Sequence, residues 1–164
     1  MTKLNAHGKG AADSATLREF AVPGGCSCRK VAMARLRAFF FDIGGTLGDV
    51  DPAALKLKPY ATTRELLKGV HTLGVQLGVI SNTPAGVGHA RILSMLKEAH
   101  LDQFFTPAAL ITSADAGASK PERAIYEYAA KALHLTPDEC VYFGENPAEV
   151  AGAIAAELHG IQKP

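Results

Sequence analysis

The chain has 164 residues, of which 48% are apolar and 20% are charged, and its formal net charge is +1. This length and balance are typical of one globular domain with its own core. The apolar runs are all shorter than the roughly 18 to 20 residues that a membrane-spanning helix needs, so we expect no membrane association.

The charge is distributed unevenly along the chain. Residues 1–37 carry +5 and the remainder carries −4. Because binding to nucleic acid rests on neutralising phosphates, an acidic body argues against a nucleic-acid partner. Residues 1–34 contain several glycines and little periodicity, so we expect a flexible basic N-terminal extension there, followed by one domain over residues 35–164.

The cysteines indicate a reducing compartment. There are three, without the spacing of a disulfide framework, and we therefore expect a cytoplasmic protein. Cys140 falls in an apolar run and is expected to be a buried free thiol. Cys26 and Cys28 are interpreted as thiols of the extension; a soft-metal or intersubunit site is the alternative, although two ligands do not complete a zinc site. No signal peptide is visible, and a transit-like role of the basic extension is left open.

Four apolar runs predict strands, and a helical pattern follows each of them. The strands are expected over residues 36–41, 75–80, 108–112 and 140–143, and the helices over 62–73, 87–99, 121–133 and 147–158. The first run, LRAFFF, has no polar face and is typical of the central strand of a parallel sheet. The alternation predicts an α/β fold, a three-layer Rossmann-like parallel sheet with helices on both faces and right-handed crossovers.

Local signals add detail to the helices and loops. Thr62 and Glu65 form a T-x-x-E pattern that predicts a capping box. Residues 43–61 hold several glycines and prolines and are expected to be turn and loop. One face of the third helix is expected to be buried, and it consists of Ile125, Tyr128, Ala129 and Leu133.

Polar residues stand where the predicted strands end. Asp42 ends the first strand, Ser81 and Asn82 end the second, Glu145 follows the fourth, and Lys120 precedes the third helix. Ligands of an open parallel sheet bind beyond the carboxyl ends of its strands, so these residues are expected to converge. A carboxylate can attack phosphorus, Ser and Lys can hold phosphoryl oxygens, and acidic side chains can hold Mg²⁺.

These segments resemble the four motifs of the haloacid dehalogenase superfamily. Asp42-Ile43-Gly44-Gly45-Thr46-Leu47 resembles its first motif, D-x-D-G-T-L. GVISN (78–82) is similar to the second, SKP (119–121) to the third, and VYFGENPAEV (141–150) to the fourth. The resemblance covers residues 36–160, and its strength lies in four motifs occurring in the right order.

The resemblance implies a role for each matching residue. Asp42 would be the nucleophile that forms an aspartyl-phosphate. The phosphate-binding residues would be Thr46, Ser81, Asn82 and Lys120. The cofactor would be Mg²⁺, and its ligands would be Asp42, the carbonyl of Gly44, Glu145 and Glu149.

Two departures from the motifs bear on the reaction. Gly44 stands where phosphatases of the superfamily have a second aspartate that protonates the leaving group and activates water, and such help typically contributes ~10²–10⁴-fold. Glu145 and Glu149 stand where aspartate is usual, and magnesium tolerates little geometric error. We expect a slow magnesium-dependent phosphohydrolase or phosphotransferase. The alternative is a catalytically weak or inactive protein that binds phosphate or a partner; dehalogenase-like chemistry ranks lower.

The spacing leaves no room for a cap domain. Only 38 residues separate Asp42 from Ser81, and another 38 separate Ser81 from Lys120. We therefore expect an open site, a phosphorylated substrate that can be large, and a flap made at most of residues 48–60. Only IQKP follows Gly160, so the fourth strand is expected to be an exposed edge, which favours a homodimer.

Overall fold

The computed structural model describes residues 36–164 of the chain. The predictions made for residues 1–34, including those for Cys26 and Cys28, lie outside the described residues. Within residues 36–164, no helix is long and apolar enough to cross a membrane.

A five-stranded parallel sheet forms the centre of the fold, in the order β5-β4-β1-β6-β7. Its strands are β1 (Ala38–Phe41), β4 (Gln76–Ser81), β5 (Leu110–Thr112), β6 (Cys140–Gly144) and β7 (His159–Gln162). The apolar run of β1 is central, as predicted, because it pairs with β4 on one side and β6 on the other. The parallel α/β fold expected from the alternation of strands and helices is confirmed.

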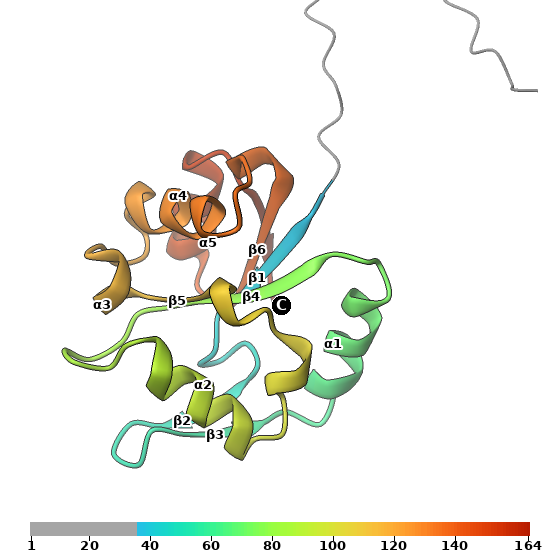
Figure 1. Cartoon of the computed structure of the whole chain (residues 1–164), viewed down its shortest axis with the longest axis vertical. Helices are drawn as coiled ribbons and strands as arrows, with labels where there is room; N and C mark the ends of the chain where they lie inside the picture. Colours follow the sequence, from blue (N-terminus) through green and yellow to red (C-terminus); the bar gives the residue numbers. More distant parts are fainter. Residues whose placement is uncertain (1–35) are drawn as a thin grey trace, which may run out of the picture. The chain divides into compact units, whose positions relative to one another are not determined.

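Helices cover both faces of this sheet (Figure 1). They are α1 (Thr63–His71), α2 (His89–Glu98), α3 (Ser113–Ala116), α4 (Arg123–Ala132) and α5 (Pro147–Ala155). Short 3-10 turns complete the connections: η1 (Asp102–Phe104), η2 (Pro107–Ala109) and η3 (Pro137–Glu139). In Figure 1, α4 and α5 lie on one side of the strands, and α1 and α2 lie on the other.

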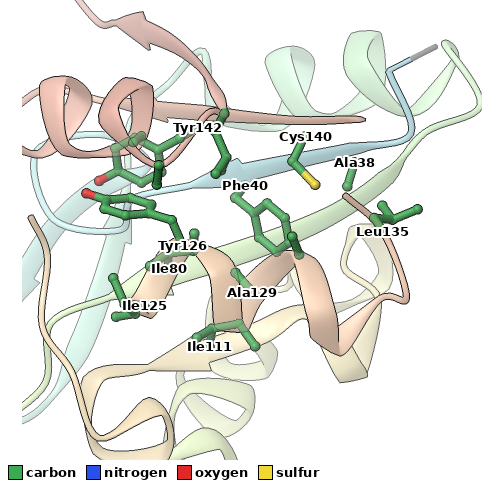
Figure 2. Close-up of a cluster of buried hydrophobic side chains, with 14 of the residues drawn as sticks. Ala38, Phe40, Ile80, Ile111, Ile125, Tyr126, Ala129, Leu135, Cys140 and Tyr142 are labelled. Carbon is green, nitrogen blue, oxygen red and sulfur yellow. The ribbon is translucent and has the colours of Figure 1, made fainter. Parts of the chain in front are cut away.

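The alternation of side chains along β1 divides the core into two clusters. Phe40 packs into a cluster with residues of α4 and α5, which include Ile125 and Tyr126 (Figure 2). Phe41 points to the opposite face and packs with residues of α1 and α2, which include Leu67 and Leu96. Because both faces of β1 are covered, the strand holds the residue that follows it, Asp42, at a fixed place on the carboxyl edge of the sheet.

The C-terminal residues correct one prediction. The fourth predicted strand, β6, is not an edge, because β7 pairs with it in parallel from Val141↔His159 to Gly144↔Gln162. The additional strand β7 has only four residues and begins at His159, before Gly160, so the residues after Gly160 supply only half of it. The homodimer stays a prediction, but the exposed edge on which it rested is covered.

The segment predicted as loop between Asp42 and the first helix contains a hairpin. Its strands β2 (Gly48–Asp51) and β3 (Lys56–Pro59) pair in antiparallel register. β3 packs against α2, and Figure 1 shows the hairpin beside this helix. The alternation of apolar Val50 and Leu57 with charged neighbours carries the strand pattern, but the surrounding glycines and prolines hide it.

Two helix predictions differ from the structure. Thr62 makes no side-chain capping bond, because its backbone is already helical at φ −88° and ψ −11°, whereas a capping residue is normally extended. α4 begins at Arg123, and it buries Tyr126 and Ala130 with Ile125 and Ala129, whereas Tyr128 is exposed. Leu133, just after the helix, is buried as well, so the predicted face is correct except at Tyr128, and Tyr126 and Ala130 widen it on the other side.

Candidate active site

The predicted nucleophile and the predicted lysine are in direct contact at the carboxyl edge of the sheet. Lys120 Nζ lies 2.6 Å from Asp42 Oδ1 and 2.7 Å from Glu149 Oε2. The Lys120 side chain is almost completely buried, and the Asp42 and Glu149 side chains retain 12% and 14% exposure. Three residues from three separate predicted motifs thus form one buried ionic cluster.

Burial governs the ionisation of Asp42. Desolvation raises the pKa of its carboxyl above the usual value, and it outweighs the charge and hydrogen bond of Lys120, which lower that pKa. The neighbouring charge of Glu149 raises it further. The ionised carboxylate is therefore poorly solvated and depends on Lys120, an environment typical of an activated group in a catalytic site.

The ammonium of Lys120 lies among three protein groups. It donates hydrogen bonds to Asp42 and, at 3.0 Å, to the hydroxyl of Tyr142, and it forms an ion pair with Glu149. Lys120 therefore contributes its charge and holds the two carboxylates close together.

Tyr142 completes the ring of contacts. Its hydroxyl accepts from Lys120 and donates to Glu149 Oε2 at 2.8 Å. Burial, followed by the charges of Asp42 and Glu149, raises the pKa of this phenol far above its usual range, so the proton stays in place. Tyr126 packs edge-on against Tyr142 at 5.4 Å, and Figure 2 shows both hydroxyls at the same end of the cluster. The Tyr126 hydroxyl donates to the Glu149 carbonyl.

Asn82 holds the backbone of Lys120. Its side-chain oxygen accepts from the Lys120 amide at 2.8 Å, and its side-chain nitrogen donates to the Lys120 carbonyl at 3.0 Å. Both ends of the Asn82 amide are thus used to join the end of β4 to the start of the Lys120 segment. Ser81 is buried beside it and lines the same pocket as Asp42. The predicted phosphate contacts of Asn82 and Ser81 stay predictions.

Thr46 joins the turn after β1 to the loop after β6. Its hydroxyl accepts from the backbone N–H of Glu145 at 3.1 Å, and the side chain is buried. The Glu145 side chain extends over this turn, since a Cβ on Gly45 would lie 2.6 Å from Glu145 Cγ. Gly45 has φ +68°, so both its conformation and its lack of a side chain are required here. Phosphate binding by Thr46 stays a prediction.

The predicted magnesium ligands fit the ion in kind. Asp42, Gly44 and Glu145 all border one pocket and offer two carboxylates and a carbonyl. Mg²⁺ is commonly held by one or two carboxylates, with water and substrate phosphate completing its shell. Glu149 differs, because its carboxylate is engaged by Lys120 and Tyr142. Within residues 36–164, no group of three or more His, Cys, Asp or Glu side chains is placed to hold a metal ion.

The pocket has a volume of about 320 Å³. Its polar side is formed by Asp42, Ser81, Lys120, Glu145 and Glu149. The predicted convergence of these residues is therefore observed. The opposite side comes from the hairpin, which lies in the segment 48–60 expected to form at most a flap, and from α2, which sequence reasoning did not assign to the site.

Tyr142 belongs to the site, but the sequence analysis did not identify it. It lies within an apolar strand, where a tyrosine is normally interpreted as a core residue. A signal was present, however, since a buried tyrosine normally needs a partner for its hydroxyl, and Tyr142 lies two residues before the end of a strand that leads into the site.

Comparisons with known proteins agree with this geometry. The model of the haloacid dehalogenase-like hydrolase family matches residues 50–157, which include Lys120 and Glu149 and begin after Asp42. The (S)-2-haloacid dehalogenase 2 of Pseudomonas sp. (strain CBS-3) is 31% identical over 99 residues, which are 60% of this chain and 41% of that protein. The chain thus spans about two fifths of the length of this relative.

Solved structures share the fold. A protein from Corynebacterium glutamicum that is described as uncharacterized is 28% identical, with a TM-score of 0.59 over 79% of this chain and 85% of that one. A HAD phosphatase from Thermococcus onnurineus is 20% identical, with a TM-score of 0.62 over 75% of this chain and 84% of that one. At 20% identity the likeness concerns the fold alone. The family match, which covers well over half of the chain, shows that the protein belongs to the haloacid dehalogenase-like hydrolases.

Proposed function

We propose that the protein hydrolyses or transfers a phosphoryl group through a covalent aspartyl-phosphate on Asp42. The observation that carries this proposal is the buried contact of Asp42 Oδ1 with Lys120 Nζ at the floor of a pocket. Lys120 holds one carboxylate oxygen, so the other, Oδ2, is the atom that attacks phosphorus. The P–O bond to the leaving group breaks as the new P–O bond forms, and water then releases phosphate and regenerates Asp42.

Magnesium is part of this proposal. The donors that would hold it are the carboxylates of Asp42 and Glu145 and the carbonyl of Gly44, all at the pocket. Bound there, the ion would offset the repulsion between the carboxylate and the phosphoryl oxygens. Glu149 acts instead through Lys120, whose ammonium it helps to fix beside Asp42.

Gly44 limits which leaving groups depart easily. It has no side chain to donate a proton, and a Cβ at this position would meet only Val50, at 4.0 Å. A leaving group that departs as a stable anion needs no such proton, whereas an alkoxide does. Acyl and aryl phosphates are therefore the expected good substrates, and alkyl phosphates are expected to react slowly.

Dehalogenation is the second candidate function. It is favoured by the similarity to (S)-2-haloacid dehalogenase 2 and by the apolar side of the pocket. Here Asp42 would displace halide from carbon and form an alkyl ester. The halide also leaves without a proton, so this reaction does not need an acid at position 44.

The remaining alternative is a protein that binds phosphate or a partner without turnover. It differs from both reactions in that neither phosphate nor halide would be released from any substrate.

The test compares phosphate release from acetyl phosphate and p-nitrophenyl phosphate, with and without Mg²⁺, against chloride release from 2-chloropropanoate. Asp42→Asn should abolish the reaction that the protein performs. Asp138→Asn is the matched control. Asp138 is an exposed aspartate in η3, just before the start of β6, whereas the site lies beyond the end of that strand. Phosphate release that survives Asp42→Asn would refute the aspartyl-phosphate, and chloride release alone would select dehalogenation.

A further inference from the structure

The apolar side of the pocket is built by three segments that lie outside the four motifs. The β2–β3 hairpin contributes Val50 and Leu55, the loop before α2 contributes Val87, and α2 contributes Ile92 and Met95. Ile92 and Met95 are also part of the core cluster on this face of the sheet. This apolar wall, as we call these five residues, therefore stands on a rigid support opposite the ionic cluster of Asp42 and Lys120.

Leu55 is the unusual member of the apolar wall. It lies at the tip of the hairpin with φ +49°, a left-handed conformation that is a genuine outlier for leucine. Such a conformation typically persists where surrounding contacts enforce it, often at a ligand site. Arg91 supplies those contacts, since its guanidinium donates to the carbonyls of Ala54 and Leu55 at 3.0 and 2.9 Å.

Arg91 is itself fixed from α2. It forms an ion pair with Glu98, about two turns further along the same helix, at 3.3 Å. The arginine thus ties the hairpin tip to α2 and holds the Leu55 side chain at the pocket. Glycine at position 55 would adopt this backbone without strain, so the leucine carries a conformational cost at the place where it lines the pocket.

We propose that the substrate joins its reacting anionic group to a short apolar body, and that Leu55 determines specificity for that body. The volume of about 320 Å³ equals that of about ten water molecules, which suits an anionic head and a body of a few carbons. This inference rests on the proposed function for the identity of the head group. The large substrate expected from the missing cap stays a prediction, and the same experiment decides between the two.

The probe is a series of alkylphosphonates, from methyl to pentyl, whose binding is measured by calorimetry in the presence of Mg²⁺. These compounds carry the anionic head but cannot be hydrolysed, so binding is read without turnover. Each methylene that reaches the apolar wall should tighten binding about fourfold until the pocket is filled. Affinity that is independent of chain length, or no binding by any member, would overturn the proposal.

Two variants test the role of Leu55. Leu55→Gly removes the side chain but suits the left-handed backbone, so the variant should be at least as stable as the wild type while its gain per methylene falls to less than about twofold. Leu73→Gly is the matched control, because Leu73 is an exposed leucine just beyond α1 and away from the pocket. If Leu55→Gly keeps the full gain per methylene, the assignment to Leu55 is wrong.

Turnover gives a separate readout. Acetyl, propionyl and butyryl phosphate have leaving groups of nearly equal basicity, so differences in kcat/KM report the apolar contact and not the chemistry. Rising kcat/KM along this series supports both proposals. If phosphonate binding depends on chain length but no phosphate is released, the proposed function is refuted and the apolar specificity is supported. If phosphate is released at the same kcat/KM from all three acyl phosphates, the specificity alone is refuted.

Discussion

Replacing Lys120 with methionine is the sharpest test of the ionic cluster. The substitution keeps most of the aliphatic volume and removes the ammonium, which contacts Asp42 at 2.6 Å, Glu149 at 2.7 Å and the Tyr142 hydroxyl at 3.0 Å. Asp42 and Glu149 would then face each other without compensation. Removing one partner of a buried ion pair typically costs about 3–5 kcal/mol, and we expect a loss of this size in the free energy of unfolding at pH 7.

The pH dependence of this loss provides an internal check. Desolvation already raises the pKa of Asp42, and Lys120 is the principal group that lowers it, so the pKa of Asp42 should rise further in Lys120→Met. A carboxyl whose pKa is raised in the folded state destabilises the protein above that pKa and ceases to do so as the pH falls below it. The difference between variant and wild type should therefore shrink as the pH is lowered from 7 toward 4.

Urea denaturation at several pH values measures both effects. Lys131→Met is the control, because Lys131 is exposed on α4, and its loss should stay within about 0.5 kcal/mol. The double variant Lys120→Met/Glu149→Gln should recover part of the stability, since it removes one of the two uncompensated carboxylates. A loss below about 1 kcal/mol for Lys120→Met, or a loss that does not change with pH, would refute the buried cluster as the arrangement in solution.

Three further predictions concern single positions. Tyr142→Phe keeps the ring and removes one of the three partners of the ammonium, so kcat on acetyl phosphate should fall about tenfold with little change in KM. Gly44→Asp places a carboxyl in open space and should raise phosphate release from an alkyl phosphate at least about tenfold if the missing proton donor limits the rate; no change would locate the limit elsewhere. Burial raises the pKa of the Cys140 thiol to about 12, so in a protein with Cys26→Ser and Cys28→Ser, iodoacetamide at pH 8 should label no thiol until denaturant is added.

The sequence allowed the sheet and the convergence of the site to be predicted for one physical reason. Strands that are buried on both faces are continuous apolar runs, and in a parallel sheet their carboxyl ends meet at one edge. Asp42, Ser81 and Glu145 each follow such a run, so their proximity followed from the order of elements alone. β7 was not predicted, because it is an edge strand with little burial and its sequence, HGIQ, has no comparable apolar run.

The apolar wall could not be predicted in the same way. The hairpin that carries part of it is short, and its strands hold four charged residues but only two apolar ones, Val50 and Leu57. The contact that fixes its tip joins Arg91 to two backbone carbonyls 36 and 37 residues away. A hydrogen bond to a carbonyl does not depend on the side chain of the acceptor residue, so it leaves no trace in the sequence of residues 54 and 55.

The same limit explains which roles within the site were hardest to assign. A polar residue at the end of a strand can contact a ligand or hold a neighbouring loop, and the sequence does not distinguish these uses. Asn82 and Thr46 make the second kind of contact, to the backbone of Lys120 and of Glu145. Asn82 and Lys120 are 38 residues apart in sequence, and Thr46 and Glu145 are 99 residues apart, so these hydrogen bonds connect separate predicted motifs. They align Asp42, Lys120 and Glu145 before any ligand binds, and preorganisation of this kind lowers the cost of reaching a charged transition state.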